Sequence, residues 1–118
     1  MSDLKQLSVA QLQALLSPQQ LPASPLPLLL LDVREPWEAA LASIQVSGAP
    51  SLLMPMSQVP ARWQELDPQQ PIICYCHHGM RSLQVVAFLQ RQGFDSVLNL
   101  AGGIDAWSSE VDSAVPRY

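Results

Sequence analysis

A cysteine that follows an apolar, strand-like run and opens a short loop is the residue of this chain best placed to do chemistry. The run is Pro71–Tyr75, the cysteine is Cys76, and a helical pattern extends from Met80 to Gln92 after a loop that contains Gly79. Such a loop points backbone N–H groups inward toward the sulfur, and the helix adds its positive amino-terminal end. A thiol in that field ionises readily and becomes a nucleophile.

The same segment carries an arginine, which offers a fixed charge and a planar fork of donors for an anionic substrate. Four residues separate Cys76 from Arg81, whereas the loop of cysteine-dependent phosphatases is one residue longer and wide enough for a phosphate. Counting from Cys74 gives a spacing that fits neither pattern. The shorter loop closes around a group nearer the size of one sulfur atom. Ion pairing of Arg81 with Glu35 or Asp32 is the structural alternative to a substrate contact.

Three further motifs stand in order around this loop. Leu31–Glu38 reads as a strand that ends in Asp-Val-Arg with a glutamate nearby, Gly48-Ala49 reads as a small turn, and Leu100–Trp107 holds a Gly-Gly, an apolar residue and a tryptophan. Together with the loop, these motifs resemble the rhodanese-like sulfurtransferase family over about Ser8–Trp107. One departure is Gln45, where the family often has a histidine. The departure lies outside the cysteine loop and bears on local packing and substrate contacts.

The resemblance implies an enzyme that moves a sulfane sulfur from thiosulfate or a persulfide donor to a thiophilic acceptor through a persulfide on the catalytic Cys76. The acceptor is cyanide in an assay, or a thiol, a thioredoxin-like protein or a sulfur-carrier protein in a cell. No metal or organic cofactor is required, and one covalent intermediate between two half-reactions predicts ping-pong kinetics. The implied substrate-binding residues are Arg81, His77, His78, Gly79, Met80 and Ser82. The implied supporting residues are Asp32, Arg34 and Glu35, and ion pairs of Asp32, Arg34 and Glu38 are expected to tie the loop and the strand ends together.

Strand-like and helical segments alternate along the chain, which predicts an α/β fold with a central parallel sheet and helices on both faces. The expected strands are Leu28–Val33, Ser51–Met54, Ile72–Tyr75 and Val97–Leu100, and the expected helices are one that follows Ser8, Pro36–Leu41, Val59–Leu66, Met80–Gln92 and one that starts at Gly103. A single rhodanese-like domain is expected over residues 1–118, with its core at about 8–107, a connector at Pro18–Pro27 and a loose tail at 110–118. Ligands of such sheets bind beyond the carboxyl ends of the strands, where Cys76 and Asp32 both fall.

Composition and charge narrow the function classes. The 118 residues are 48% apolar and 14% charged, which favours one globular domain over disorder. The net charge of −4 disfavours broad nucleic-acid binding, which needs a basic surface. The longest aliphatic run, Leu28–Leu31, is too short to span a membrane, and Met1–Gln6 shows no targeting pattern. Two cysteines spaced by one residue do not make a disulfide framework, so a reducing, cytoplasmic location is expected.

The same residues allow other interpretations. Cys74 fits a core position, and a resolving role through a strained bridge to Cys76 is its alternative. A metal cluster of Cys74, Cys76, His77 and His78 does not match the common zinc spacings. At the level of function, one alternative is a non-catalytic rhodanese-like module that binds a partner or senses redox state. Another is a phosphatase or arsenate reductase, which the loop length disfavours.

Overall fold

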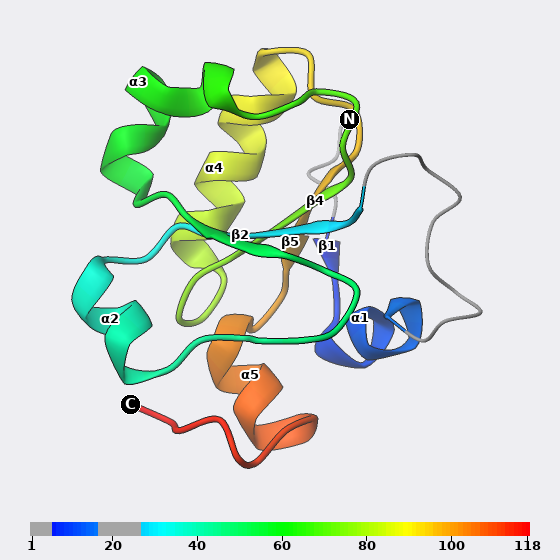
Figure 1. Ribbon diagram of the computed structural model, residues 1–118, viewed down its shortest axis with the longest axis vertical. Helices are drawn as coiled ribbons and strands as arrows, with labels where there is room; N and C mark the ends of the chain where they lie inside the picture. Colours follow the sequence, from blue (N-terminus) through cyan, green and yellow to red (C-terminus); the bar gives the residue numbers. More distant parts are fainter. Residues whose placement is uncertain (1–5, 17–26) are drawn as a thin grey trace.

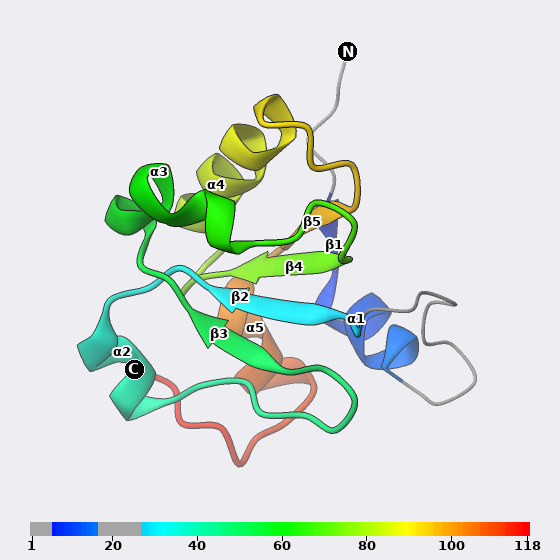
Figure 2. The same ribbon diagram turned by 45° about the horizontal axis from the view of Figure 1, so that its top comes forward.

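A five-stranded parallel sheet forms the centre of the protein, with helices on both faces (Figures 1 and 2). The computed structural model describes residues 6–16 and 27–118. The strand order is β1-β5-β4-β2-β3, where β1 is Gln6–Leu7, β2 is Leu29–Asp32, β3 is Ser51–Leu53, β4 is Ile72–Tyr75 and β5 is Val97–Leu100. The predicted fold class is confirmed, and β1 is an addition to the predicted strands. Of the connector predicted at 18–27, residues 18–26 lie outside the described residues.

Five α-helices are described, and all five begin where the sequence predicts. They are α1 (Val9–Leu15), α2 (Pro36–Leu41), α3 (Val59–Arg62), α4 (Met80–Arg91) and α5 (Gly103–Glu110). The helix predicted over Val59–Leu66 is shorter than expected, because its second half is a 3-10 turn at Trp63–Glu65. Within the described part of the chain, no helix has the length and apolar character needed to cross a membrane.

Each face of the sheet has its own hydrophobic core. On one face, Val59 of α3 and Val86 of α4 pack with residues of the strands, and on the other, Leu12 of α1 and Ile104 of α5 do the same. In Figure 2 the sheet is seen between these two layers, with α3 and α4 above it and α1 and α5 below it. Both faces are therefore covered, which is why the strands read as continuous apolar runs instead of alternating ones.

The register of the strands brings the functional segments to one edge. β4 lies between β2 and β5, with Cys74 opposite Leu31 on one side and Asn99 on the other. Because all strands are parallel, the residues that follow β2, β4 and β5 emerge at the same edge of the sheet. Cys76 is the first residue after β4, and Arg34 follows β2 closely.

The segment after α5 corrects one prediction, since it is an ordered part of the domain and not a loose tail. The Val115 carbonyl accepts a hydrogen bond from the Ser108 hydroxyl, and Arg117 forms an ion pair with Asp105 at 3.0 Å. Tyr118 is half-buried and packs on the same core as α5. Figures 1 and 2 both show this segment running from α5 to the side of α2. A short segment of mixed polar and apolar residues has no hydrophobic periodicity, so its placement can be recognised only from tertiary contacts.

Candidate active site

Three hydrogen-bond donors converge on the sulfur of Cys76. The backbone N–H of Gly79 lies 3.1 Å from the sulfur, the backbone N–H of Ser82 lies 3.4 Å from it, and the Ser82 hydroxyl lies 3.3 Å from it. Cys76 is 1% exposed and forms no disulfide. Donors arranged in this way stabilise negative charge that develops on a sulfur atom during a reaction.

The path of the loop explains this convergence. Gly79 has a φ of +101°, a left-handed conformation that side chains disfavour, and it turns the chain from the loop into the first turn of α4. The first N–H groups of a helix have no partner within the helix. In α4 the N–H of Ser82 is one of these groups, and it points at the sulfur together with the positive end of the helix dipole.

The Gly-Gly motif after β5 closes the loop from the other side. The N–H groups of Ile104 and Asp105, in the first turn of α5, donate to the carbonyls of Cys76 and His77 at 2.9 and 3.0 Å. This approach requires a glycine at position 103, because a Cβ there would lie 2.4 Å from the Cys76 carbonyl oxygen. Two helix amino termini thus hold the loop, α4 through the sulfur and α5 through the backbone carbonyls.

A buried polar chain fixes Ser82, and the sequence gives no local signal for it. The Ser82 hydroxyl lies 2.5 Å from Oδ1 of Asn99, and Nδ2 of Asn99 donates to the Gly79 carbonyl at 3.1 Å and to the Gln6 side chain at 2.9 Å. Ser82 and Asn99 are fully buried. Only the sheet register, which places Asn99 opposite Cys74, brings this side chain under the loop.

Arg81 pairs with Glu38, and not with Glu35 or Asp32, which the alternative to a substrate contact named as partners. The two guanidinium nitrogens lie 2.7 and 2.8 Å from the two carboxylate oxygens of Glu38. The pKa of Glu38 is lowered from 4.5 to about 2. The main cause is the pair of hydrogen bonds from Arg81, and burial of the carboxylate acts in the opposite direction. The Arg81 side chain is one third exposed, so it lies at the boundary between the loop and solvent.

Beneath this pair lies a second, fully buried arginine. Arg34 pairs with both oxygens of Asp32, at 2.8 and 2.7 Å, and donates to the Tyr118 hydroxyl at 2.8 Å. That hydroxyl lies 2.8 Å from Glu38, to which it donates. The predicted ion pairs that tie the loop and the strand ends together are therefore present, and Tyr118 links them. Glu35 is exposed, and its backbone N–H donates to Glu38.

Comparison with known proteins identifies the family. The family model described as "Rhodanese-like domain" matches residues 8–110. The chain belongs to the rhodanese-like family. It is 41% identical over 80 residues to a sulfurtransferase of Allochromatium vinosum, which covers 68% of this chain and 71% of that protein. It is also 30% identical over 113 residues to a thiosulfate sulfurtransferase of Pseudoalteromonas translucida, which covers 96% and 97% of the two chains.

Other comparisons bear on the fold and on chain length. A rhodanese-related protein from Thermoplasma volcanium has a similar structure, with a TM-score of 0.74 and 28% identity over 91% of this chain and 93% of that one. A chloroplastic protein of Arabidopsis thaliana with a rhodanese-like and a PpiC domain is 40% identical over 89 residues. The match covers 75% of this chain but only 30% of the longer Arabidopsis protein.

Aromatic rings line the rim of the rhodanese loop. The His77 ring stacks on the Tyr118 ring and on the His78 ring, with centroids 4.0 Å apart in both cases. Trp37 is exposed and meets Tyr118 edge-on at 6.3 Å. Burial, and secondly the neighbouring His78, lower the pKa of His77, which favours its neutral ring. Met80, at the start of α4, is 72% exposed. Of the predicted substrate-binding residues, His77, His78 and Met80 therefore lie at the surface of the loop and not around the sulfur.

Two remaining predictions concern residues outside the loop. Cys74 is fully buried in the core, and burial raises the pKa of its thiol, so it stays protonated and enclosed. This placement supports the core reading of Cys74 over a resolving role. Gln45, at the position of the usual family histidine, is exposed and donates to the Ser43 hydroxyl at 3.0 Å.

Proposed function

We propose that this rhodanese-like protein moves a sulfane sulfur from thiosulfate or a persulfide donor to a thiophilic acceptor, through a persulfide on Cys76. The observation that carries the proposal is the convergence of the Gly79 N–H, the Ser82 N–H and the Ser82 hydroxyl on one buried sulfur. A buried cysteine with an ordinary structural role would not need three donors. Here they stabilise the thiolate before attack and hold the sulfur while the bond forms.

The reaction has two steps. In the first, the Cys76 thiolate attacks the outer sulfur of thiosulfate, a new S–S bond forms at Cys76, and the S–S bond of thiosulfate breaks. The bonding electron pair leaves with sulfite. In the second, an acceptor such as cyanide attacks the outer sulfur of the persulfide, the S–S bond at Cys76 breaks, and thiocyanate leaves as the thiolate re-forms. Neither step needs a proton, metal or electron carrier from elsewhere.

The neighbouring residues take supporting roles in this proposal. The N–H groups of the loop bind the charged outer sulfur of the persulfide, since successive inward N–H groups form an anion-binding concavity. Arg81 contributes positive charge to an anionic donor, but its bidentate pair with Glu38 makes this contribution modest. His77, His78 and Met80 contact the donor or the acceptor at the rim. An Arg81→Ala variant is therefore expected to raise the KM for thiosulfate more than it lowers kcat.

Thiosulfate as a donor is supported by the similarity to the thiosulfate sulfurtransferase of Pseudoalteromonas translucida. For the acceptor we propose a thiol, a thioredoxin-like protein or a sulfur-carrier protein, each of which presents a nucleophilic sulfur. A reducing compartment such as the cytoplasm suits the mechanism, because it keeps the Cys76 thiolate free between turnovers.

Intact-protein mass after brief incubation with thiosulfate tests the proposal. A gain of one sulfur atom, about 32 Da, that cyanide removes is expected of an activated cysteine nucleophile. Cys76→Ser should show no gain, whereas Cys74→Ala, a matched cysteine control in the core, should gain the same mass as wild type. A gain that persists in Cys76→Ser would refute the assignment of the nucleophile. No gain with thiosulfate or with a low-molecular-weight persulfide would refute the proposed function.

A further inference from the structure

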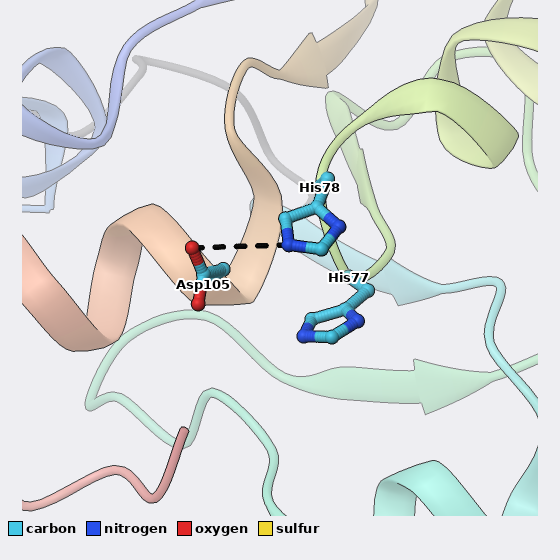
Figure 3. Close-up of side chains that lie close together, drawn as sticks. All are labelled: His77, His78 and Asp105. Atoms are coloured by element: carbon cyan, nitrogen blue, oxygen red, sulfur yellow. Dashed lines mark ion pairs between the residues drawn. The ribbon is translucent and has the colours of Figure 1, made fainter. Parts of the chain in front are cut away.

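Two histidines of the cysteine loop and one carboxylate of α5 come together outside the sulfur site (Figure 3). A side-chain ligand atom from each of His77, His78 and Asp105 lies within 4.8 Å of the others. His78 Nε2 is 3.8 Å from Asp105 Oδ2, which is too long for a hydrogen bond. Two atoms bound to one tetrahedral Zn²⁺ at its usual bond lengths are about 3.4 Å apart. The distance between His78 Nε2 and Asp105 Oδ2 is close to this value.

The backbone holds these side chains in place without any ion. The N–H of Asp105 donates to the His77 carbonyl at 3.0 Å, which joins the loop directly to the first turn of α5. The His77 ring stacks on Tyr118 and on His78, with interplanar angles of 7° and 25°. Because an imidazole binds a metal ion in the plane of its ring, one histidine ring must turn out of this stack when both bind the same ion.

One atom of this cluster points to a ligand independently. His77 Nε2 is shielded from solvent and, among the residues that the structure describes, has no hydrogen-bond partner. Buried polar atoms in native proteins nearly always have a partner, and an orphan atom is a common sign of a bound water or ion. Figure 3 shows the His77 ring below that of His78, with a nitrogen of each ring on the side of the Asp105 carboxylate.

We propose that His77, His78 and Asp105 form a binding site for a divalent transition-metal ion, with Zn²⁺ as the reference ion. Two imidazole nitrogens and one carboxylate oxygen are a ligand set that Zn²⁺, Co²⁺ and Ni²⁺ accept, and three protein ligands leave a fourth position for water. The site contains no cysteine, so it differs from the Cys-His cluster that the sequence spacing disfavours. It does not depend on the proposed function, because binding is measurable without sulfur transfer.

Arg117 is the natural competitor for the site. Its guanidinium lies 3.0 Å from Oδ1 and 3.3 Å from Oδ2 of Asp105, so it occupies the carboxylate that an ion would share. Removal of this positive charge favours a cation at the same carboxylate. Arg117→Ala is therefore expected to bind the ion more tightly than wild type, which a site elsewhere on the surface would not do.

Isothermal titration of the untagged full chain with Zn²⁺ tests the proposal, with Co²⁺ absorption as a second readout of coordination. We expect one ion per chain in wild type and in Cys76→Ser, with no sulfur-to-cobalt charge-transfer band. His78→Ala and Asp105→Asn should each weaken binding at least roughly tenfold, as expected for a lost ligand interaction. Glu110→Gln, which changes an exposed carboxylate on the same helix, should leave the affinity unchanged.

Three results would overturn the proposal. Loss of binding in Cys76→Ser would show that the thiolate is the ligand. Equal affinities of Asp105→Asn, Glu110→Gln and wild type would show adventitious surface binding. If the His77 ring nitrogen signals in nitrogen-15 NMR spectra of Cys76→Ser did not shift on addition of Zn²⁺, His77 would not be a ligand. The NMR measurement needs no change at His77, so it holds even if a His77 variant fails to fold.

Discussion

Replacement of Glu38 by glutamine is expected to destabilise the protein in a way that depends on pH. Glu38 is 3% exposed, yet it accepts hydrogen bonds from both terminal nitrogens of Arg81, from the Tyr118 hydroxyl and from the Glu35 backbone. Glutamine keeps the size and shape of the side chain but removes its charge. It also turns an N–H₂ group toward the Arg81 guanidinium, where two donors cannot pair.

The pKa of Glu38 sets the magnitude. The native contacts, chiefly those with Arg81, lower this pKa from 4.5 to about 2. Each unit corresponds to about 1.4 kcal/mol, so the ionised carboxylate contributes about 3 kcal/mol, or about 2 kcal/mol after allowance for the partial exposure of Arg81. Because the folded-state pKa is lowered, this contribution is fully present above the unfolded-state pKa near 4.5. It is lost as the pH falls through that value toward 2.

Urea denaturation of wild type and Glu38→Gln over a series of pH values measures the difference directly. The free energy of unfolding of the variant should be about 2–3 kcal/mol lower at neutral pH, and the gap should close progressively below about pH 4.5. Glu65→Gln is the control, because Glu65 forms an exposed ion pair with Arg62 and should change stability little. A constant gap between wild type and Glu38→Gln down to low pH would refute the reasoning, since it would show a packing effect and not a charge effect.

Three further substitutions test the support of the loop. Ser82→Ala removes one of the three donors to the Cys76 sulfur. The rate of persulfide formation, measured by stopped flow, should therefore fall about 10- to 100-fold. An unchanged rate would contradict the donor role of the Ser82 hydroxyl. Gly103→Ala places a Cβ 2.4 Å from the Cys76 carbonyl oxygen, whereas Gly93 also has a positive φ (+95°, against +60° at Gly103) but nothing within 4 Å of its Cβ position. Tm should therefore fall much further in Gly103→Ala than in Gly93→Ala, and equal losses would leave only backbone strain as the cause. Tyr118→Phe keeps the ring stack but loses the hydroxyl bonds to Arg34 and Glu38, which should cost about 1–2 kcal/mol in urea denaturation. No loss in Tyr118→Phe would mean that water replaces the hydroxyl.

Local patterns were enough to predict much of the fold. Ile72–Tyr75 and Val97–Leu100 match β4 and β5, because apolar runs bounded by turn residues mark buried parallel strands. β1 has only two residues and lies at the edge of the sheet, which is too short for any periodic signal. From the sequence, the segment at 110–118 is predicted to be a loose tail, because it is held in place by contacts with residues far away in the sequence. The hydrogen bond from Arg34 to the Tyr118 hydroxyl is one such contact.

The same division applies to the site. The Cys76 loop could be predicted because its donors come from the few residues that follow the cysteine, at Gly79 and Ser82. Asn99 and Tyr118 could not, since each reaches the loop from another element and neither stands in a motif with it. Register and tertiary packing, and not local sequence, decide such contacts. A sequence therefore predicts the proposed nucleophile more readily than the residues that hold it in place.

The Ser82 hydroxyl shows why that outer support matters for the proposed chemistry. It has one proton and two acceptors within reach, Oδ1 of Asn99 at 2.5 Å and the Cys76 sulfur at 3.3 Å. A charged acceptor forms the stronger hydrogen bond. In the proposed reaction we therefore expect a Cys76 thiolate to draw this proton toward sulfur, and the neutral inner sulfur of the persulfide to return it to Asn99. Asn99 stays in place through either state because its amide also donates to the Gly79 carbonyl and to Gln6. The edge strand β1, which no local signal predicts, therefore helps to keep the Ser82 hydroxyl near the Cys76 sulfur.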